Sequence, residues 1–358
     1  MTTFRSHITR REAIRLATIG GASIVLGSSA AVSGASFTTG TGRTPKPTGA
    51  SPTGTTGKVT TIRYAHGAPV THPSHVWGTK FAEVLESLTG GGVKVQIFPN
   101  VQLGKDPEVV GEVQAGIVEM INSGNSVFSQ YVPAATIMDM PYLFKDLDHL
   151  YKVQDGTVGQ QIGKLYEEKS FRVLGWADIG VRHITNSKRP IDKPGDLKGL
   201  KMRVVPSKVF VETFKALGPN VVTLDFSELY LALQQGVVDG EDNPVTTIQA
   251  AKFYEVQKYL SLTAHVVGTN PSVVSEKFFA KQPPEIQKAL VDAGAEATKT
   301  TRQFVRDNES KALDFLKGKG MAVNTPNRTP FRAATASVYQ TLKDQAPPDL
   351  VTKIRALG

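Results

Sequence analysis

The chain has 358 residues, 40% of them hydrophobic, and it contains no cysteine. This length fits two ordinary domains better than one, and the lack of cysteine excludes disulfide frameworks, thiolate metal sites, iron–sulfur clusters and cysteine nucleophiles. The formal net charge is +9, but residues 1–60 contain seven Lys or Arg against a single acid, Glu12. The rest of the chain is therefore nearly neutral, so nucleic acid is not an expected partner.

Residues 1–36 are predicted to be an export signal. Arg10 and Arg11 precede a weakly apolar run from Ile19 to Val32, and small residues such as Ala35 follow. This order is typical of a cleavable signal, here of the twin-arginine kind. A membrane anchor is the alternative, although the run is short and diluted by Gly and Ser. We expect an exported protein in the periplasm or at the extracytoplasmic face of the membrane.

Residues 37–60 are predicted to be a disordered linker. Eighteen of these 24 residues are Thr, Gly, Pro or Ser. Such a composition buries too little apolar surface to offset the entropy of ordering the chain. Folding is expected to start near Thr61.

Helical and strand periods then alternate, which argues for parallel or mixed α/β sheets. A first helix is predicted from one apolar face, and a strand follows it: Trp77, Phe81, Val84, Leu85 and Leu88, then Val93 to Ile97. Asp106 is expected to cap the next helix, with Pro107 in its first turn and a buried stripe of Val110, Val113 and Ile117.

The second half of the chain continues the same cycle. Two strands are expected at Val173–Trp176 and Met202–Val205, and a helix capped by Ser227 carries Leu229 and Leu233. The segment from Pro283 to Leu316 has no internal proline after Pro284 and predicts a helix about 45 Å long. Such a helix exceeds the breadth of one domain, so we expect it to cross from one domain to the other.

Motifs for phosphate binding or metal binding are not supported. The run Gly90–Gly92 follows a helix and precedes a strand, the reverse of the order that a phosphate loop needs. His66, His72 and His75 are close in sequence, but no H-E-x-x-H pattern or neighbouring carboxylate accompanies them. No metal and no cofactor are expected.

Acid–base catalysis is not supported either. Asp239, Glu241 and Asp242 could pair for such chemistry only if a leaving-group site lay beside them. By themselves they are typical of residues that cap loops. The residues therefore do not predict an enzyme.

Four segments together form a specific signature. They read VKVQIFPNVQLGKDPEVVGEVQAGIVEM at 93–120, DMPYLF at 139–144, GVRHITNSKRP at 180–190 and LDFSELYLALQQGVVDGEDNP at 224–244. In this order they resemble the DctP-type solute-binding proteins of tripartite ATP-independent periplasmic (TRAP) transporters. The likeness extends from Ile62 to about Leu316.

The resemblance implies a two-domain α/β fold like that of periplasmic binding proteins, with a ligand cleft between the domains and a long helix that spans both. Domain I would comprise 61–180 plus 269–308, and domain II 181–268 plus 309–358. The implied function is that of a receptor, which captures a small organic acid and delivers it to the membrane permease of a TRAP system. We expect the protein to be a monomer.

The resemblance also assigns ligand-binding residues in domain II. Arg203, in the matching stretch DLKGLKMRV at 196–204, corresponds to the arginine that holds the ligand carboxylate, and a guanidinium can donate to both carboxylate oxygens. Arg182 matches a second arginine near the ligand, and Asn243 matches an asparagine at its polar end. Phe226 matches an aromatic residue on the apolar face of the ligand, with plain core packing as its alternative.

One stretch departs from the family pattern. The usual Gly-Gln-Glu-Asn is Gly240-Glu241-Asp242-Asn243 here, so Glu241 and Asp242 join the candidate site. Some members form a buried relay between this second acid and a histidine at the position of His265. The shorter side chain of Asp242 argues against such a relay in this chain.

Ligand choice depends on domain I, where His66, Asn122 and Asn125 lie near ligand positions of relatives but differ from them in residue type. The loop from Asn122 to Asn125 lacks the family acid, which disfavours an amine-bearing or sialic-acid-like ligand. We therefore expect a hydroxylated acid such as a uronate or aldonate rather than a four-carbon dicarboxylate. A secreted hydrolase or isomerase that acts on sugar acids is the alternative function.

Overall fold

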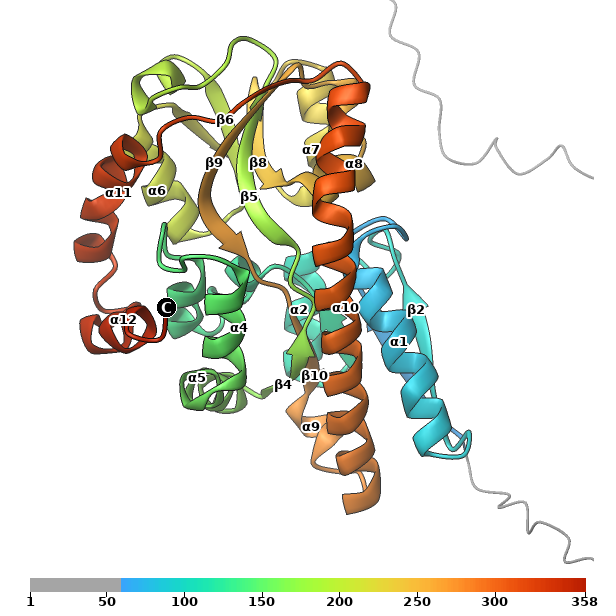
Figure 1. The fold of residues 1–358 in the computed structure, drawn as a ribbon. Coiled ribbons are helices and arrows are strands. Elements are labelled where there is room, and N and C mark those ends of the chain that lie inside the picture. The colour runs from blue at the N-terminus through green and yellow to red at the C-terminus, as the bar shows by residue number, and fades with distance from the viewer. Residues whose placement is uncertain (1–58) are drawn as a thin grey trace, which may run out of the picture. The chain divides into compact units, whose positions relative to one another are not determined.

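A computed structural model describes residues 59–358; the predicted export signal and almost all of the predicted linker lie outside the described residues. The described chain is a mixed α/β protein with two sheets, each flanked by helices (Figure 1). We call the part built on the first sheet lobe I and the part built on the second sheet lobe II.

Lobe I contains five strands in the order β2-β1-β3-β10-β4. They are β1 (Thr60–Ala65), β2 (Val93–Phe98), β3 (Met120–Asn122), β4 (Phe171–Trp176) and β10 (Pro271–Ser275). β1 runs parallel to β2 and β3, whereas β10 runs antiparallel to β3 and β4. Its helices are α1 (Pro73–Leu88), α2 (Asp106–Ala115), α3 (Asn125–Phe128), the 3-10 helix η1 (Pro133–Asp139), α4 (Leu147–Asp155), α5 (Thr157–Glu167) and α9 (Glu276–Phe279).

Lobe II contains six strands in the order β11-β9-β5-β8-β6-β7. They are β5 (Gly180–Asn186), β6 (Lys201–Val204), β7 (Asn220–Thr223), β8 (Gly240–Pro244), β9 (Tyr259–Gly268) and β11 (Ala322–Asn324). β5 pairs antiparallel with β8 and β9, and β6 lies parallel between β7 and β8. Its helices are η2 (Pro194–Leu197), α6 (Lys208–Leu217), α7 (Phe226–Gln234), α8 (Val245–Ala250), η3 (Phe253–Glu255) and α11 (Thr329–Thr341).

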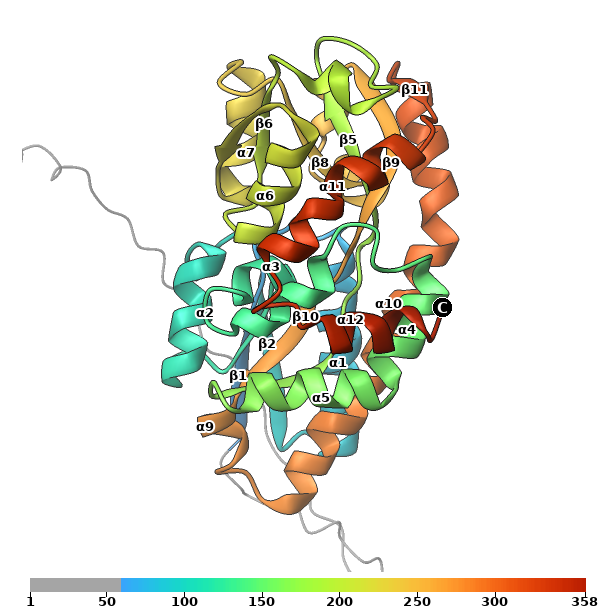
Figure 2. The same cartoon turned by 90° about the vertical axis from the view of Figure 1, so that its left-hand side faces the viewer.

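The chain crosses between the lobes several times. β4 leads into β5, β9 leads into β10, and the 35-residue helix α10 (Pro284–Gly318) packs on α1 and β4 in lobe I and on α8 in lobe II (Figures 1 and 2). The expected helix that spans both sheets is therefore confirmed. After α11, which packs on α6, the chain returns to lobe I, where α12 (Pro348–Arg355) packs on α5.

The structure corrects several local predictions. Leu88 and Ile117, expected on buried faces, are 51% and 60% exposed. α2 ends at Gly116, whose positive φ of 81° terminates the helix before the apolar period reaches Ile117. The N-cap residues are Lys105 and Asp225, so the predicted caps Asp106 and Ser227 lie within the first turns of α2 and α7.

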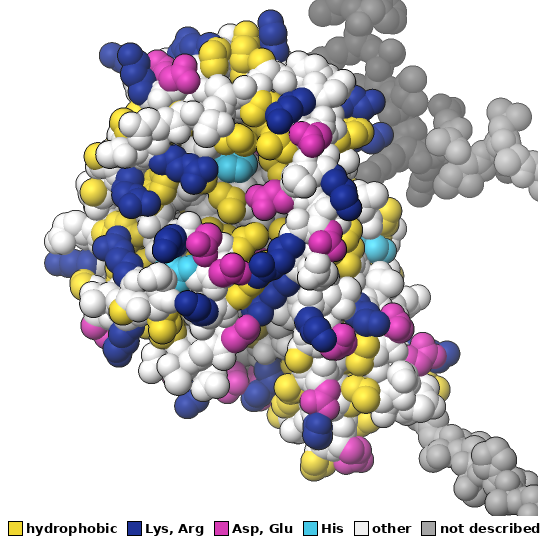
Figure 3. Space-filling view, in the orientation of Figure 1, with side chains coloured by type: hydrophobic (Ala, Val, Ile, Leu, Met, Phe, Trp, Pro, Cys, Tyr) yellow, Lys and Arg dark blue, Asp and Glu magenta, His cyan; other side chains and the backbone are white. Residues whose placement is uncertain are grey.

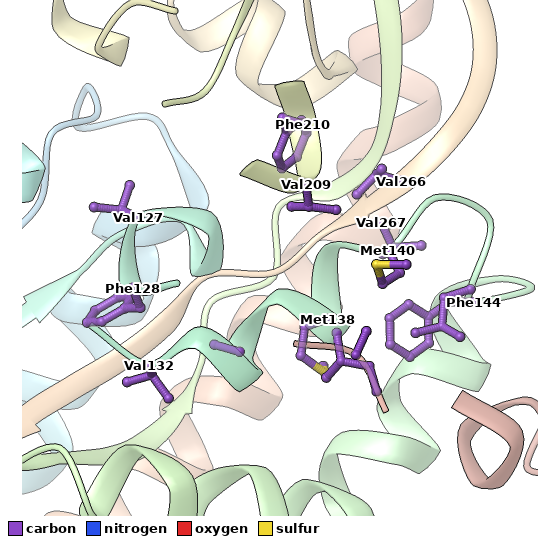
Figure 4. Packing of buried hydrophobic residues seen from close by; sticks show 14 of the residues in the cluster. Val127, Phe128, Val132, Met138, Met140, Phe144, Val209, Phe210, Val266 and Val267 are labelled. Atoms are coloured by element: carbon purple, nitrogen blue, oxygen red, sulfur yellow. The ribbon is translucent and has the colours of Figure 1, made fainter. Parts of the chain in front are cut away.

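The largest apolar cluster extends across both lobes beside the crossings. Figure 4 shows part of it: Met138, Met140 and Phe144 of lobe I lie near Val266 and Val267 of β9, and Val209 and Phe210 of α6 lie on the other side of that strand. Because close packing of this kind stabilises a defined arrangement, the lobes are joined by core as well as by chain.

Ion pairs also connect the elements around α10. Arg302 lies 2.7 Å from Asp155, and Arg306 pairs with Asp148, so α10 is fastened to α4. Figure 3 shows acidic and basic side chains side by side along this part of the surface. Within residues 59–358, no helix is both long enough and apolar enough to span a membrane.

Candidate ligand cleft

A cavity of about 100 Å³ lies between the two lobes. Lobe I contributes the loop after β1, the start of α2 and the segment that follows β3. Lobe II contributes β5, β6, β8 and the first residues of α7. Five of the nine predicted ligand residues line this cavity, namely Arg203, Arg182, Asn243, Phe226 and Asn122.

Arg203 is a buried cation at the wall of the cavity. It is 1% exposed, and its Nε donates to the carbonyl oxygen of Leu224 at 2.8 Å. Among the described residues, no carboxylate lies within 4.0 Å of its guanidinium. Burial lowers the pKa of Arg203 to about 10, while Asp242 opposes this change and Arg182 adds to it. Since an uncompensated buried charge is costly, the geometry suits an anion that enters the cavity.

Arg182 differs from Arg203 because its charge is already balanced. Its Nε lies 2.7 Å from Oδ2 of Asp242, and its guanidinium also donates to the Asp242 carbonyl oxygen. The same Oδ2 lies 3.2 Å from Nε2 of His265, whose Nδ1 lies 2.8 Å from the hydroxyl of Thr263. The relay that the shorter Asp242 argued against is therefore formed.

Asp242 itself lies behind the cavity and is fully buried. Burial acts to raise its pKa, but Arg182 and His265 stabilise the carboxylate, and the pKa is lowered overall. Asp242 thus positions Arg182 at the cavity wall from behind.

Glu241 also lies behind the wall and is fully buried. Its Oε1 is 2.7 Å from the hydroxyl of Thr185, its neighbour across the β5–β8 pair, and its Oε2 accepts from Nδ2 of Asn243 at 2.5 Å. Burial, together with the charge of Asp242, raises the pKa of Glu241 to about 7. Glu241 therefore contacts Asn243, which does line the cavity.

Phe226 is the first residue of α7, and it both lines the cavity and packs against the core, the two roles expected from the sequence. It lines the cavity, and its ring lies 5.9 Å from that of Phe253 at an angle of 63°. This edge-to-face contact fixes the ring from the core side. An apolar face of the cavity is the result.

Lobe I presents hydrogen-bond acceptors to the cavity. Nδ2 of Asn122 donates to the hydroxyl of Ser272 at 3.0 Å and to backbone carbonyl groups, whereas its buried Oδ1 has no partner among residues 59–358. Asp106 lines the same wall and accepts a hydrogen bond from Ser123 at 2.6 Å. Burial raises the pKa of Asp106 to about 6.

Asp106 was not singled out as a ligand residue from the sequence. An Asp before a Pro is typical of a helix start. This local pattern explains the residue by itself and gives no sign that it also lines a cavity. Lys105 takes the cap position instead, which leaves the Asp106 side chain at the cavity.

His66 and Asn125 do not line the cavity. Asn125 donates to Asp139 at 2.8 Å and accepts from Tyr166 at 2.7 Å, so its amide is used within lobe I. Nε2 of His66 lies 3.1 Å from Nδ1 of His75, and burial lowers the pKa of His66 to about 4. These partners hold both side chains away from the predicted ligand contact.

The possible metal site has no structural support in the described part of the chain. No group of three or more His, Asp or Glu side chains there lies close enough to hold a metal ion. His72, the third histidine of that sequence cluster, instead lies 3.1 Å from the hydroxyl of Thr247 in lobe II.

Direct contacts connect the lobes around the cavity. Besides the His72 contact, Nζ of Lys105 lies 2.6 Å from Glu228 at the start of α7, and Gln130 donates to the carbonyl oxygen of Pro206 at 3.1 Å. The structure therefore shows the lobes closed over the cavity.

Comparison with known proteins supports a common family. The profile of the family described as bacterial extracellular solute-binding protein, family 7, matches residues 64–345. A solute-binding protein from Verminephrobacter eiseniae is 39% identical over 77% of this chain and 83% of its own length.

Solved structures agree in fold. A TRAP periplasmic solute-binding protein from Polaromonas, bound to D-erythronate, has a TM-score of 0.81 and 35% identity, and the match covers 83% of this chain and 98% of that one. Another from Sulfurospirillum deleyianum, bound to succinate, has a TM-score of 0.79 and 33% identity, covering 83% and 99%.

Proposed function

The chain belongs to the family 7 bacterial extracellular solute-binding proteins, and from this premise we propose that it holds a hydroxylated organic acid, such as an aldonate or uronate, in the cavity between its lobes. It is a solute-binding protein of the TRAP type. This family consists of transport receptors and not of enzymes, so the hydrolase or isomerase alternative is dropped.

The observation that carries the proposal is the guanidinium of Arg203, which is buried at the cavity and has no acid partner among the described residues. A carboxylate would supply the missing counter-charge and could accept two parallel hydrogen bonds. Arg182 lines the same wall and would add a second cation beside the carboxylate, while Asn243 lies on this wall too and would contact a neighbouring polar group of the ligand.

The lobe I wall favours hydroxyl groups at the other end of the ligand. Oδ1 of Asn122 and the carboxyl group of Asp106 are acceptors, so a ligand hydroxyl can donate to them. A second carboxylate would meet these oxygens with unfavourable charge. The relatives include receptors for both kinds of acid, since one was solved with D-erythronate and another with succinate. The acceptors of this wall are the reason for our preference.

The remaining assignments are also proposals. We retain 61–180 plus 269–308 as domain I and 181–268 plus 309–358 as domain II, with α12 at the end of the second range packing back on α5 of lobe I. We also propose that the protein acts as a monomer. The permease partner is proposed to be the membrane part of a TRAP system, and the site of action the extracytoplasmic face of the membrane.

A thermal-shift panel tests the ligand class. The full chain is heated with D-erythronate, L-galactonate, D-glucuronate or succinate, and with the methyl ester of each acid. A ligand at a hundred times its dissociation constant adds about 2.7 kcal/mol of stability. We expect a shift with at least one hydroxylated acid, none with its ester and none in Arg203→Lys. A shift with succinate alone would overturn the preference for hydroxylated acids, and the absence of any shift would overturn the assignment of the cavity.

A further inference from the structure

The side chains around Glu241 offer too few hydrogen-bond donors to satisfy an ionised carboxylate at this position. Oγ1 of Thr185 lies 2.7 Å from Oε1 of Glu241 and 3.0 Å from Oε1 of Gln257. Both neighbours are acceptors if Glu241 is ionised, yet a hydroxyl group has only one hydrogen to donate. In one of these two short contacts, two acceptor oxygen atoms would then face each other without a hydrogen atom between them.

Rotation of the Gln257 amide does not remove this conflict. Its Nε2 donates to the carbonyl oxygen of Val256 at 2.9 Å and lies 3.5 Å from that of Asp239. Because both of these partners are carbonyl oxygens, they require the nitrogen on that side. Oε1 of Gln257 therefore faces Thr185 and needs its hydrogen.

We propose that Glu241 carries a proton on Oε1 in the folded protein, and that this neutral acid gives the ligand site the net positive charge that an anionic ligand requires. The proton is donated to Thr185, and the Thr185 hydroxyl donates in turn to Gln257. Oε2 of Glu241 stays a carbonyl-type acceptor and receives Nδ2 of Asn243. Each donor in this series of hydrogen bonds then has an acceptor.

The surroundings favour the neutral form. Glu241 is fully buried, and burial disfavours a charged carboxylate. The charged groups near it are Asp242, which also raises its pKa, Arg182, which lowers it, and Arg203. Burial is the largest of these effects, and the pKa of about 7 keeps much of Glu241 protonated at neutral pH.

The charge balance gives the proton a role in binding. Arg182 and Arg203 supply two positive charges, and Asp242 supplies one negative charge. Asp225 also lines the cavity, but Lys105 lies 3.6 Å from its carboxylate and balances its charge. With Glu241 neutral, the wall has a net charge of +1, which one ligand carboxylate balances. With Glu241 ionised, the wall has no net charge, and a bound carboxylate would leave the site negative. This step rests on the proposed function, because it takes the cavity as the carboxylate site.

The same proton affects ligand choice through Asn243. Its Nδ2 is engaged by Glu241, and its Oδ1 accepts no hydrogen bond found among residues 59–358. Asn243 therefore presents an acceptor to the cavity, which suits a ligand hydroxyl next to the carboxylate. Glu241 is thus a positioning residue for Asn243 rather than a ligand contact.

An infrared measurement on the unliganded full chain tests the proton directly. The carbonyl stretch of protonated carboxyl groups is recorded at pH 6 for the parent chain and for Glu241→Gln, and the spectra are subtracted. Other protonated acids cancel in the difference. We expect a band that is lost in Glu241→Gln and unchanged in the surface control Glu212→Gln. A difference spectrum without that band would overturn the proposal.

Calorimetry tests the link to binding. D-erythronate, or the acid from the thermal-shift panel that binds, is titrated at pH 6.5 to 8.5 in two buffers of different ionisation enthalpy. The parent chain should take up protons and lose affinity by up to about tenfold per pH unit above 7. Glu241→Gln should show less proton uptake and an affinity that varies less than about twofold. Equal proton uptake in both would overturn the link. If no acid binds, the proposed function fails, while the infrared result still decides the proton.

Discussion

Oδ2 of Asp178 lies 3.9 Å from Nε of Arg302, and neither atom has a hydrogen-bond partner among the described residues. Asp178 is fully buried in the connection between β4 and β5, and Arg302 belongs to α10. Two of the crossings between the lobes therefore meet at one incompletely formed ion pair. Gln154 donates to the other carboxylate oxygen at 2.9 Å.

The pair predicts a pH-dependent stability. Burial raises the pKa of Asp178 to about 7, above its value near 3.9 in the unfolded chain. The stability linked to this proton is present below about pH 4 and is lost as the pH rises to 7. The melting temperature of Asp178→Asn, measured relative to the parent chain, should therefore rise by a few °C between pH 5 and 8. A difference that stays constant over this range would contradict the assigned shift.

Arg203→Lys should separate binding from stability. The variant keeps the charge but loses the planar fork, so the affinity for the acid that binds in the thermal-shift panel should fall by about a hundredfold or more. Because Arg203 has no acid partner within residues 59–358, the melting temperature of the unliganded protein should not fall. Calorimetry and melting curves measure the two effects, with Arg306→Lys on α10 as the control. An affinity within about threefold of the parent would refute the role of Arg203.

Asp106→Asn should change the choice between acids. A neutral amide removes the charge that opposes a second carboxylate and can donate to it. The affinity for succinate relative to D-erythronate should rise by about tenfold, as measured by competition in calorimetry. Asp148→Asn, on the surface of α4, is the matched control. An unchanged ratio would mean that Asp106 does not face the distal end of the ligand.

Lys105→Met should weaken the contact between α2 and α7. Since Lys105 and Glu228 are both exposed, the affinity should fall by no more than about fivefold, and the loss should shrink at high salt. Small-angle scattering should still show a smaller radius of gyration with the acid than with its methyl ester, at a higher ligand concentration than in the parent. The prediction fails if the variant no longer closes at all.

The fold could be predicted from the sequence because its signals are local or repeated. The face of Trp77, Phe81 and Leu85 and the long proline-free segment of α10 each match an element of the structure. The exposed Ile117 shows the limit of this approach, since an apolar period does not show where a helix ends. The end of α2 at Gly116 is evident only from the left-handed backbone conformation of this glycine in the structure.

The cavity could be predicted only in part. The motif around Arg203 identified a residue that does line it. Asn125 was placed near the ligand by its sequence position, but its partners Asp139 and Tyr166 come from separate helices, and no local pattern indicates such contacts. Asp106 was missed for the opposite reason, because a plausible local role concealed its place at the cavity.

The separate crossings between the lobes limit how the protein can move. A pair of bodies joined by one flexible connection can twist and slide in several directions, whereas β4–β5, β9–β10, α10 and the α11–α12 connection must all deform together. We therefore expect rotation about a single axis to be the easiest motion between the lobes. Closure then removes little orientational entropy, so more of the free energy of contact with the ligand is retained as affinity.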